Sequence, residues 1–301
     1  MNKTILGILS LLLVGQPAVA EPFVFDWPDD ATATVESRVE HGPDTSVMQY
    51  DIRLRRVSGA GDFDLEFTNV ALVSINGQPA NTPEVQAQMG PMRGLLTVLL
   101  TLVINKMGHY RDISGIEALS DELLKFMPDE MDLDMRLRFG EFFRSPAMQA
   151  KLRARGGDLW NAWVGSWVGH DLSIGETSAG MVPINLAGRE IEQAVSVDNL
   201  GYDSEYPSAI RLRLVTTTES PALVVSSNPM VRTMATQLAR SETYAIEDFK
   251  SVKMTTVIEA VVEPSTLKPQ IVERINQVVI THNEGRYDRD SEKSRYVFTW
   301  K

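Results

Sequence analysis

The side chains able to carry out chemistry are scattered along this sequence. Ser265 and Lys268 have the S-x-x-K spacing of some acyl-transfer enzymes, but prolines flank them, so a turn is expected instead of the helix that this motif needs. The sequence holds four histidines in turn-like contexts, and none belongs to a pair with metal-ligand spacing: His41, His109, His170 and His282. We therefore expect no catalytic residues, no metal site and no cofactor, and favour a non-enzymatic protein.

A short acidic stretch offers oxygen ligands for a cation. Asp198, Asn199, Asp203 and Glu205 lie close together in the sequence, and calcium prefers ligands of this type. Their spacing differs from that of the helix–loop–helix calcium loop. A hairpin turn with solvated acids explains the same residues, and we favour the turn over a calcium site.

Aromatic residues are concentrated between residues 158 and 176, in the stretch DLWNAWVGSWVGHDLSIGE. It contains three of the five tryptophans, at spacings that place them on one side of a helix. Such a concentration either lines a pocket for an apolar ligand or plugs the join between helices and a sheet, and we favour the plug. The residues that would line an apolar hollow are Trp160, Trp163, Trp167, Leu100, Leu102, Phe139 and Phe142.

Strands that could hold these residues are predicted at both ends of the chain. Apolar and charged residues alternate in YDIRLRRVS and FDLEFT, and the glycine-rich turn between them predicts a hairpin with one apolar and one charged face. Near the end, AIRLRLVTT also alternates. Three further stretches predict a closing meander: FKSVKMTTVIEAVVEP, KPQIVERINQVVITH and SRYVFTWK, the last with Tyr296, Phe298 and Trp300 on one face.

The middle of the chain is predicted to be largely helical. The apolar run from Leu95 to Ile104 fits either a buried helix or a strand buried on both faces, and its Val, Thr and Ile favour the strand. A capping box at Ser114 predicts a helix over 114–127, and further helices are expected over 131–142 and 146–157. Ser145-Pro146 would cap the last of these and Gly156-Gly157 would end it. We expect the tryptophan segment to pass from a helix end into a strand near 164–174.

The N-terminus and the composition indicate a compartment. Residues 1–20 combine a lysine, a short apolar core and an Ala-Val-Ala pattern, which is typical of a cleaved signal peptide. No cysteine is present, so lipid anchoring through cysteine and disulfides are excluded, and a bacterial periplasm is favoured. A net charge of −11 without a basic run makes the chain a poor nucleic-acid binder and predicts repulsion from anionic lipid surfaces.

These elements predict an α+β fold. We expect a curved antiparallel β-sheet, like a half-barrel, with a central helical insertion near 114–157 packed on its concave face. Residues 21–301 would form a single domain, because no repeat or low-complexity linker divides them.

The order of elements resembles a class of exported bacterial β-sheet domains of unknown function. The stretches that carry the resemblance are MGHYRDISGIEAL, DLWNAWVGSWVGHDLSIGE and VVEPSTLKPQIVERINQVVITH. The layout is also similar to the lipoprotein-carrier half-barrel, in which a curved sheet wraps helices over an apolar hollow. The resemblance covers most of the chain as a pattern without specific motifs, and it implies no catalytic residues.

We therefore expect a periplasmic protein that binds or carries an apolar, lipid-like ligand, with no membrane span after signal cleavage. The alternative is an envelope scaffold that binds a protein partner through a sheet edge or a helix face. A cavity between the helices and the sheet would favour the carrier.

Overall fold

The structure is a computed structural model, and it describes residues 21–57, 61–89, 100–116, 132–186, 189–220 and 249–301, with residues 119, 121 and 223. The predicted signal peptide, residues 1–20, lies outside the described residues. Most of the helix expected over 114–127 also lies outside them, although residues 116, 119 and 121 are helical.

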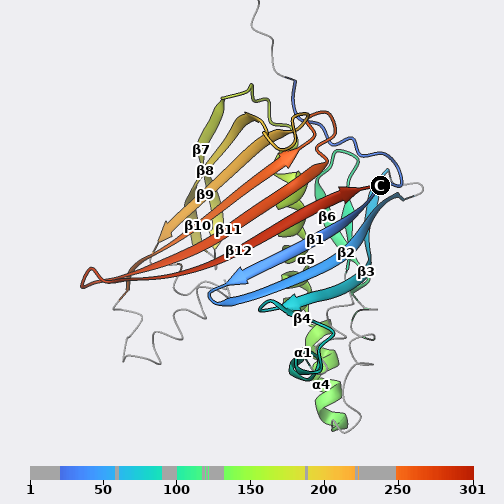
Figure 1. Ribbon diagram of the computed structural model, residues 1–301. Coiled ribbons are helices and arrows are strands. Elements are labelled where there is room, and N and C mark those ends of the chain that lie inside the picture. Colours follow the sequence, from blue (N-terminus) through green and yellow to red (C-terminus); the bar gives the residue numbers. More distant parts are fainter. Residues whose placement is uncertain are drawn as a thin grey trace, which may run out of the picture.

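One antiparallel sheet of twelve strands contains strands from both ends of the chain. The strands are β1 (Thr32–His41), β2 (Asp44–Arg56), β3 (Phe63–Ile75), β4 (Gln78–Pro79), β5 (Thr101–Ile104), β6 (Tyr110–Ser114), β7 (Thr177–Leu186), β8 (Arg189–Tyr202), β9 (Ile210–Ser220), β10 (Phe249–Val262), β11 (Pro269–His282) and β12 (Tyr287–Trp300). Their order is β6-β5-β3-β2-β1-β12-β11-β10-β9-β8-β7, with β4 beside β3. The first and last strands therefore pair with each other, as blue β1 and red β12 do in Figure 1.

The sheet is open and bends around the helical insertion. Its order has two ends, β6 and β7. Side chains from strands near both ends, such as Ile113 of β6 and Val197 of β8, belong to the same buried core. The curved antiparallel sheet predicted from the sequence is confirmed.

In the described ranges, one short helix, α1 (Pro83–Met89), follows β4, and the longer helices come between β6 and β7. These are α4 (Leu133–Arg144), α5 (Pro146–Trp160) and the π-helical turn η1 (Asn161–Gly165). As predicted, Ser145 caps α5 and Pro146 opens it. Figure 1 shows α5 behind the sheet and α4 extending below it. Among the described residues, no helix has the length and hydropathy to cross a bilayer.

The alternating patterns predicted the sheet faces correctly. β2 and β3 pair as a hairpin, with Leu54 opposite Leu65 on the buried face. On the outer face, Arg55 forms ion pairs with Asp64 and Glu66. The meander of β10, β11 and β12 also forms as predicted.

A carboxylate on the outer face links the two ends of the chain. Asp51 of β2 accepts hydrogen bonds from Thr34 of β1, at 2.5 Å, and from Asn69 of β3, at 2.8 Å. The ammonium of Lys301 approaches it to 2.9 Å. These three donors lower the pKa of Asp51 to about 2, so it remains ionised at neutral pH.

Three local predictions were wrong. The described part of the apolar run, β5, buries Leu102 and Ile104 but only half-buries Thr101 and Val103, so it is not fully buried on both faces. The strand expected near 164–174 begins instead at Thr177, after η1 and irregular chain. Gly156-Gly157 does not end α5, which continues to Trp160.

Gly156 lets α5 approach the β5–β6 hairpin closely. A Cβ atom at this position would lie 2.8 Å from the Cγ2 atom of Ile113 and 3.0 Å from the Cδ2 atom of Leu102. Gly157 lies against the ring of Tyr110 in the same way, at 3.1 Å. Glycine at these positions therefore serves packing and not helix termination.

We predict that Gly156→Val lowers the free energy of unfolding by about 1–3 kcal/mol, because overpacking forces α5 away from the sheet. Gly180→Val is the matched control, since a Cβ atom on this strand residue meets nothing within 4 Å. Urea unfolding of both variants measures the difference. An equal loss in the two variants would contradict the close approach of α5.

Candidate functional site

The three tryptophans of the central segment project from the end of α5 into the core. Trp160 is the last residue of α5, Trp163 lies in η1, and Trp167 follows η1. All three are fully buried, with 0% of each side chain exposed. The wider π-helical turn shifts the side chains relative to a regular α-helix. A Cβ atom at Gly165 would meet the side-chain amide of Asn161, which would have to shift.

Aromatic side chains from both ends of the chain contact Trp160 and Trp163. The Trp163 ring contacts Phe298 edge-on at 5.0 Å and Tyr296 at 5.5 Å between centroids. The Trp160 ring lies 5.4 Å from Trp27 and 5.7 Å from Phe25. Tyr296 and Phe298, which were predicted to share one face of β12 with Trp300, therefore pack against Trp163. We use the name aromatic cluster for these rings together with Trp160, Trp167, Trp27 and Phe25.

The indole N–H groups of the chain fall into two sets. Trp160 donates to the carbonyl oxygen of Gly108 at 2.7 Å, and Trp300 donates to that of Pro269 at 2.8 Å. The Nε1 atoms of the other three tryptophans are buried and have no hydrogen-bond acceptor among the described residues: Trp27, Trp163 and Trp167. A buried donor without a partner costs about 1–3 kcal/mol, so three in one cluster require an explanation.

The ionisable groups beside the cluster are held neutral or lie at its rim. Burial raises the pKa of Tyr50 well above its ordinary value and also raises that of Tyr296, so both phenols are uncharged at neutral pH. Asp158 lies at the rim, 3.9 Å from Arg274, with its side chain 62% exposed, and partial desolvation raises its pKa. The cluster is therefore an apolar, uncharged environment that contains free hydrogen-bond donors.

The structure brings together five of the seven residues predicted to line an apolar hollow. Leu102 is buried and Leu100 half-buried in the same core as the three tryptophans. Phe139 and Phe142 are not brought there: they lie on α4, where Phe142 is 53% exposed and contacts Phe143. Whether the five residues line a ligand pocket remains a prediction.

Sequence reasoning missed the contribution of the N-terminal lead-in. Phe23, Phe25 and Trp27 are all buried in the core although they precede the first strand. Their period-two spacing was the signal, since it places three aromatic side chains on one side of an extended segment. Trp27 also contacts Trp300 at 4.8 Å, which joins the lead-in to the last strand.

Two of the four histidines lie beside aspartates of β12. His41 approaches Asp290 at 3.1 Å, and buried His282 approaches Asp288 at 2.6 Å. In the described ranges, no group of three or more potential ligands could hold a metal ion.

The acidic stretch forms the end of β8 and the turn after it, but the expectation of solvated acids was wrong for Asp203, which is buried. The carboxylate of Asp203 accepts from the backbone N–H groups of Glu205 and Tyr206 and from the guanidinium of Arg211, at 2.6–3.2 Å. This positive charge occupies the place that a cation would need.

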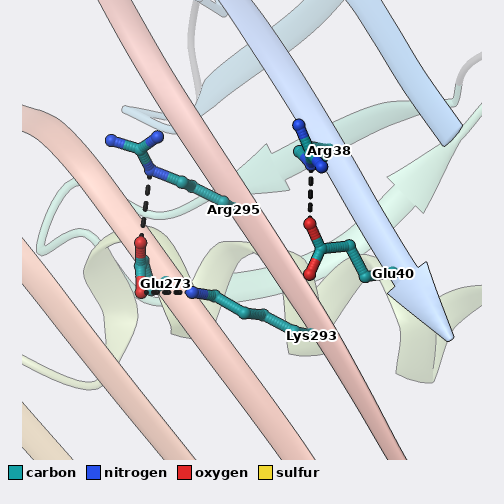
Figure 2. Close-up of a pocket in the computed structure, with 5 residues that line it drawn as sticks. All are labelled: Arg38, Glu40, Glu273, Lys293 and Arg295. Carbon is teal, nitrogen blue, oxygen red and sulfur yellow. Dashed lines mark hydrogen bonds and ion pairs between the residues drawn. The ribbon is translucent and has the colours of Figure 1, made fainter. Parts of the chain in front are cut away.

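A shallow hollow of about 180 Å³ lies on the outer face of the sheet. It is lined by Arg38, Glu40, Glu273, Lys293 and Arg295. Figure 2 shows the two arginines turned toward different carboxylates, Arg38 toward Glu40 and Arg295 toward Glu273, which also binds Lys293. Because each cation meets an acid, the hollow is a set of exposed ion pairs and offers neither a nucleophile nor a free anion site.

Comparisons with known proteins add little to this description of an open antiparallel sheet. No known family model matches the chain, and no curated protein matches it significantly. One similar solved structure is described as "Lipid-protein interactions in lipovitellin", with a TM-score of 0.39 and 9% sequence identity. The match covers 92% of this chain and 25% of that chain, so this chain spans about a quarter of the protein that it resembles.

We predict that Trp160→Phe destabilises the protein more than Trp163→Phe, by about 1–2 kcal/mol. Both variants lose the same volume from a fully buried site. Trp160→Phe also leaves the carbonyl of Gly108 without its donor, whereas Trp163→Phe removes a donor that has no acceptor. Urea unfolding compares the two. A larger loss for Trp163→Phe would show that its indole N–H has a stabilising partner.

Proposed function

We propose that this protein is an exported, non-enzymatic binder of an apolar, lipid-like ligand that carries a hydrogen-bond acceptor. The observation that carries the proposal is the set of three buried indole N–H groups without an acceptor, on Trp27, Trp163 and Trp167. An indole N–H only donates, so its partner must offer an oxygen, such as that of a carboxylate or an ester. The surrounding rings suit the apolar remainder of such a molecule.

An apolar strip on the concave face supports the same proposal. Leu214 of β9 is paired with the buried Val197 of β8, so both face the core. Val195, two residues earlier on β8, is half-buried against that core, and Val182 of β7 follows on the same face with 45% of its side chain exposed. An acyl chain lying along this strip would reach from the core to the open edge of the sheet.

The N-terminal sequence is the support for the proposal that the protein is exported. Residues 1–20 have the lysine, the apolar core and the small-residue cleavage pattern of a signal peptide. We propose a periplasmic location for the processed chain.

The second candidate function is docking of a protein partner at the sheet edge. β7 contains no charged residue, and residues 177–183 are all exposed. An extended peptide can add a strand to such an edge. Pro183 has no backbone N–H to donate to an added strand, so a peptide could pair only with the first half of β7.

The carrier proposal predicts that phenylalanine at Trp27, Trp163 or Trp167 selectively weakens binding of ligands that accept a hydrogen bond. We expect at least one of these variants to bind dodecanoate roughly tenfold more weakly, because a hydrogen bond worth about 1.4 kcal/mol is lost. Binding of dodecylammonium, which has the same chain but no acceptor, should not change. Isothermal titration with purified protein measures both ligands.

The matched control is Trp300→Phe, whose indole already donates to Pro269. This variant should not weaken binding of dodecanoate relative to binding of dodecylammonium. A second pair tests the strip: Val182→Glu, on the concave face, should weaken binding, whereas Met181→Glu, on the opposite face, should not. If the wild-type protein bound neither ligand and released no lipid on organic extraction, the proposal would be wrong.

A further inference from the structure

A guanidinium lies on the concave face of the sheet beside the aromatic cluster. Arg274 of β11 pairs with Ser294 of β12, two residues before Tyr296, so the three side chains face the same side of the sheet. Only 24% of the Arg274 side chain is exposed. The ring of Tyr296 contacts Trp163, whose indole N–H has no acceptor among the described residues. A partly buried cation and a free donor therefore lie beside the same phenol.

The guanidinium of Arg274 is held at one edge only. Its Nε atom donates to the Oδ1 atom of Asn276 at 3.1 Å, and the hydroxyl of Thr256 donates to the same oxygen at 3.0 Å. Within the described part of the chain, neither Nη atom has an acceptor at hydrogen-bond distance, and a carboxylate oxygen of Asp158 lies 3.9 Å from Nη2. The protein thus orients the guanidinium and leaves its terminal N–H groups available.

Asp158 of α5 satisfies Arg274 incompletely. The Asp158 side chain is 62% exposed, so water weakens an attraction that already acts across 3.9 Å. Partial desolvation raises the pKa of Asp158, and the positive charges of Arg274 and Arg155 offset only part of this rise. A closely formed ion pair would lower the pKa of the carboxyl instead. The attraction between Asp158 and Arg274 is therefore weak enough for another anion to replace it.

Positive charge predominates at the phenol that separates Arg274 from Trp163. Burial raises the pKa of Tyr296, and the charges of Arg274 and Arg155 oppose this rise more strongly than the charge of Glu292 adds to it. Arg155 is exposed on α5. The local charge thus favours an anion beside Tyr296, on a chain whose net charge is −11.

We propose that Arg274 binds the head of the ligand and that this head is an anion, either a carboxylate or a phosphate. The inference rests on the proposed function and narrows it, because a neutral ester or alcohol would also satisfy the indole donors. A guanidinium forms two parallel hydrogen bonds with such an anion, and they are stronger than hydrogen bonds to a neutral oxygen. The bond to Asn276 fixes the orientation of the guanidinium before the ligand arrives.

Isothermal titration with dodecanoate, dodecyl phosphate and dodecanol tests this inference. The wild-type protein should bind at least one anion tenfold more tightly than the alcohol, and the tighter anion identifies the head. Arg274→Gln should weaken binding of that anion at least tenfold and change binding of dodecanol less than twofold. Arg295→Gln is the matched control, because Arg295 pairs with Glu273 on the outer face, and it should bind all three compounds as the wild type does.

Asp158→Asn separates ligand binding from a structural role of the same contact. If Asp158 competes with the ligand for Arg274, its neutralisation should strengthen binding of the anion at least twofold, in the direction opposite to Arg274→Gln. A contact that only fastens α5 to β11 would leave the preference for the anion unchanged in both variants. If Arg274→Gln did not fold, unchanged or weaker binding of the anion by Asp158→Asn would still overturn the inference.

Two results distinguish this inference from the proposed function. Equal binding of the anions and dodecanol by the wild-type protein would overturn the role of Arg274 and leave an apolar ligand site in place. Failure to bind any of the three compounds would contradict the proposed function, and the inference would fall with it.

Discussion

The burial of Trp160, Trp163 and Trp167 against a bent antiparallel sheet is the interaction on which the rest of the structure depends. The three indoles have no exposed surface, and the rings that contact Trp160 and Trp163 come from the N-terminal lead-in, from β3 and from β12. A buried aromatic side chain removes 150–250 Å² from water, so these three contribute a large part of the apolar burial that joins the helices to the sheet. The chain has no cysteine, so this packing has no disulfide to assist it.

The same packing defines the candidate site. Close packing of α5 requires glycine at 156, where any side chain would meet Ile113 and Leu102. It also places several indole N–H groups where the described chain offers no acceptor, while Trp160 and Trp300 find backbone carbonyls. Buried donors without a partner are uncommon in protein cores, so these three call for an explanation.

The strands were predictable from the sequence because one face of each is apolar and the other is polar, so residue types alternate along the chain. Alternation in residues 52–56 and 63–67 fixed both the hairpin and the outward position of Arg55, and the same reasoning placed Tyr296, Phe298 and Trp300 on one face. The prediction that Gly156 and Gly157 end α5 was wrong because glycine has two common roles: it ends helices, and it lets a helix approach its neighbours closely. The position of Ile113 beside Gly156 identifies the second role, and the sequence does not contain that position. The π-helical turn depends on contacts with strands distant in the sequence, which no local pattern contains. The unpaired state of an indole N–H likewise depends on acceptors from the whole fold.

The central claim is that the aromatic cluster holds the two ends of the chain in one cooperative unit. It is tested most directly by urea unfolding followed in parallel by tryptophan fluorescence and by hydrogen exchange of the β1 and β12 amides. The account predicts that both signals change at the same urea concentration, because those strands lose their packing when the indoles are exposed. A fluorescence change that is complete while β1 and β12 stay protected would contradict it.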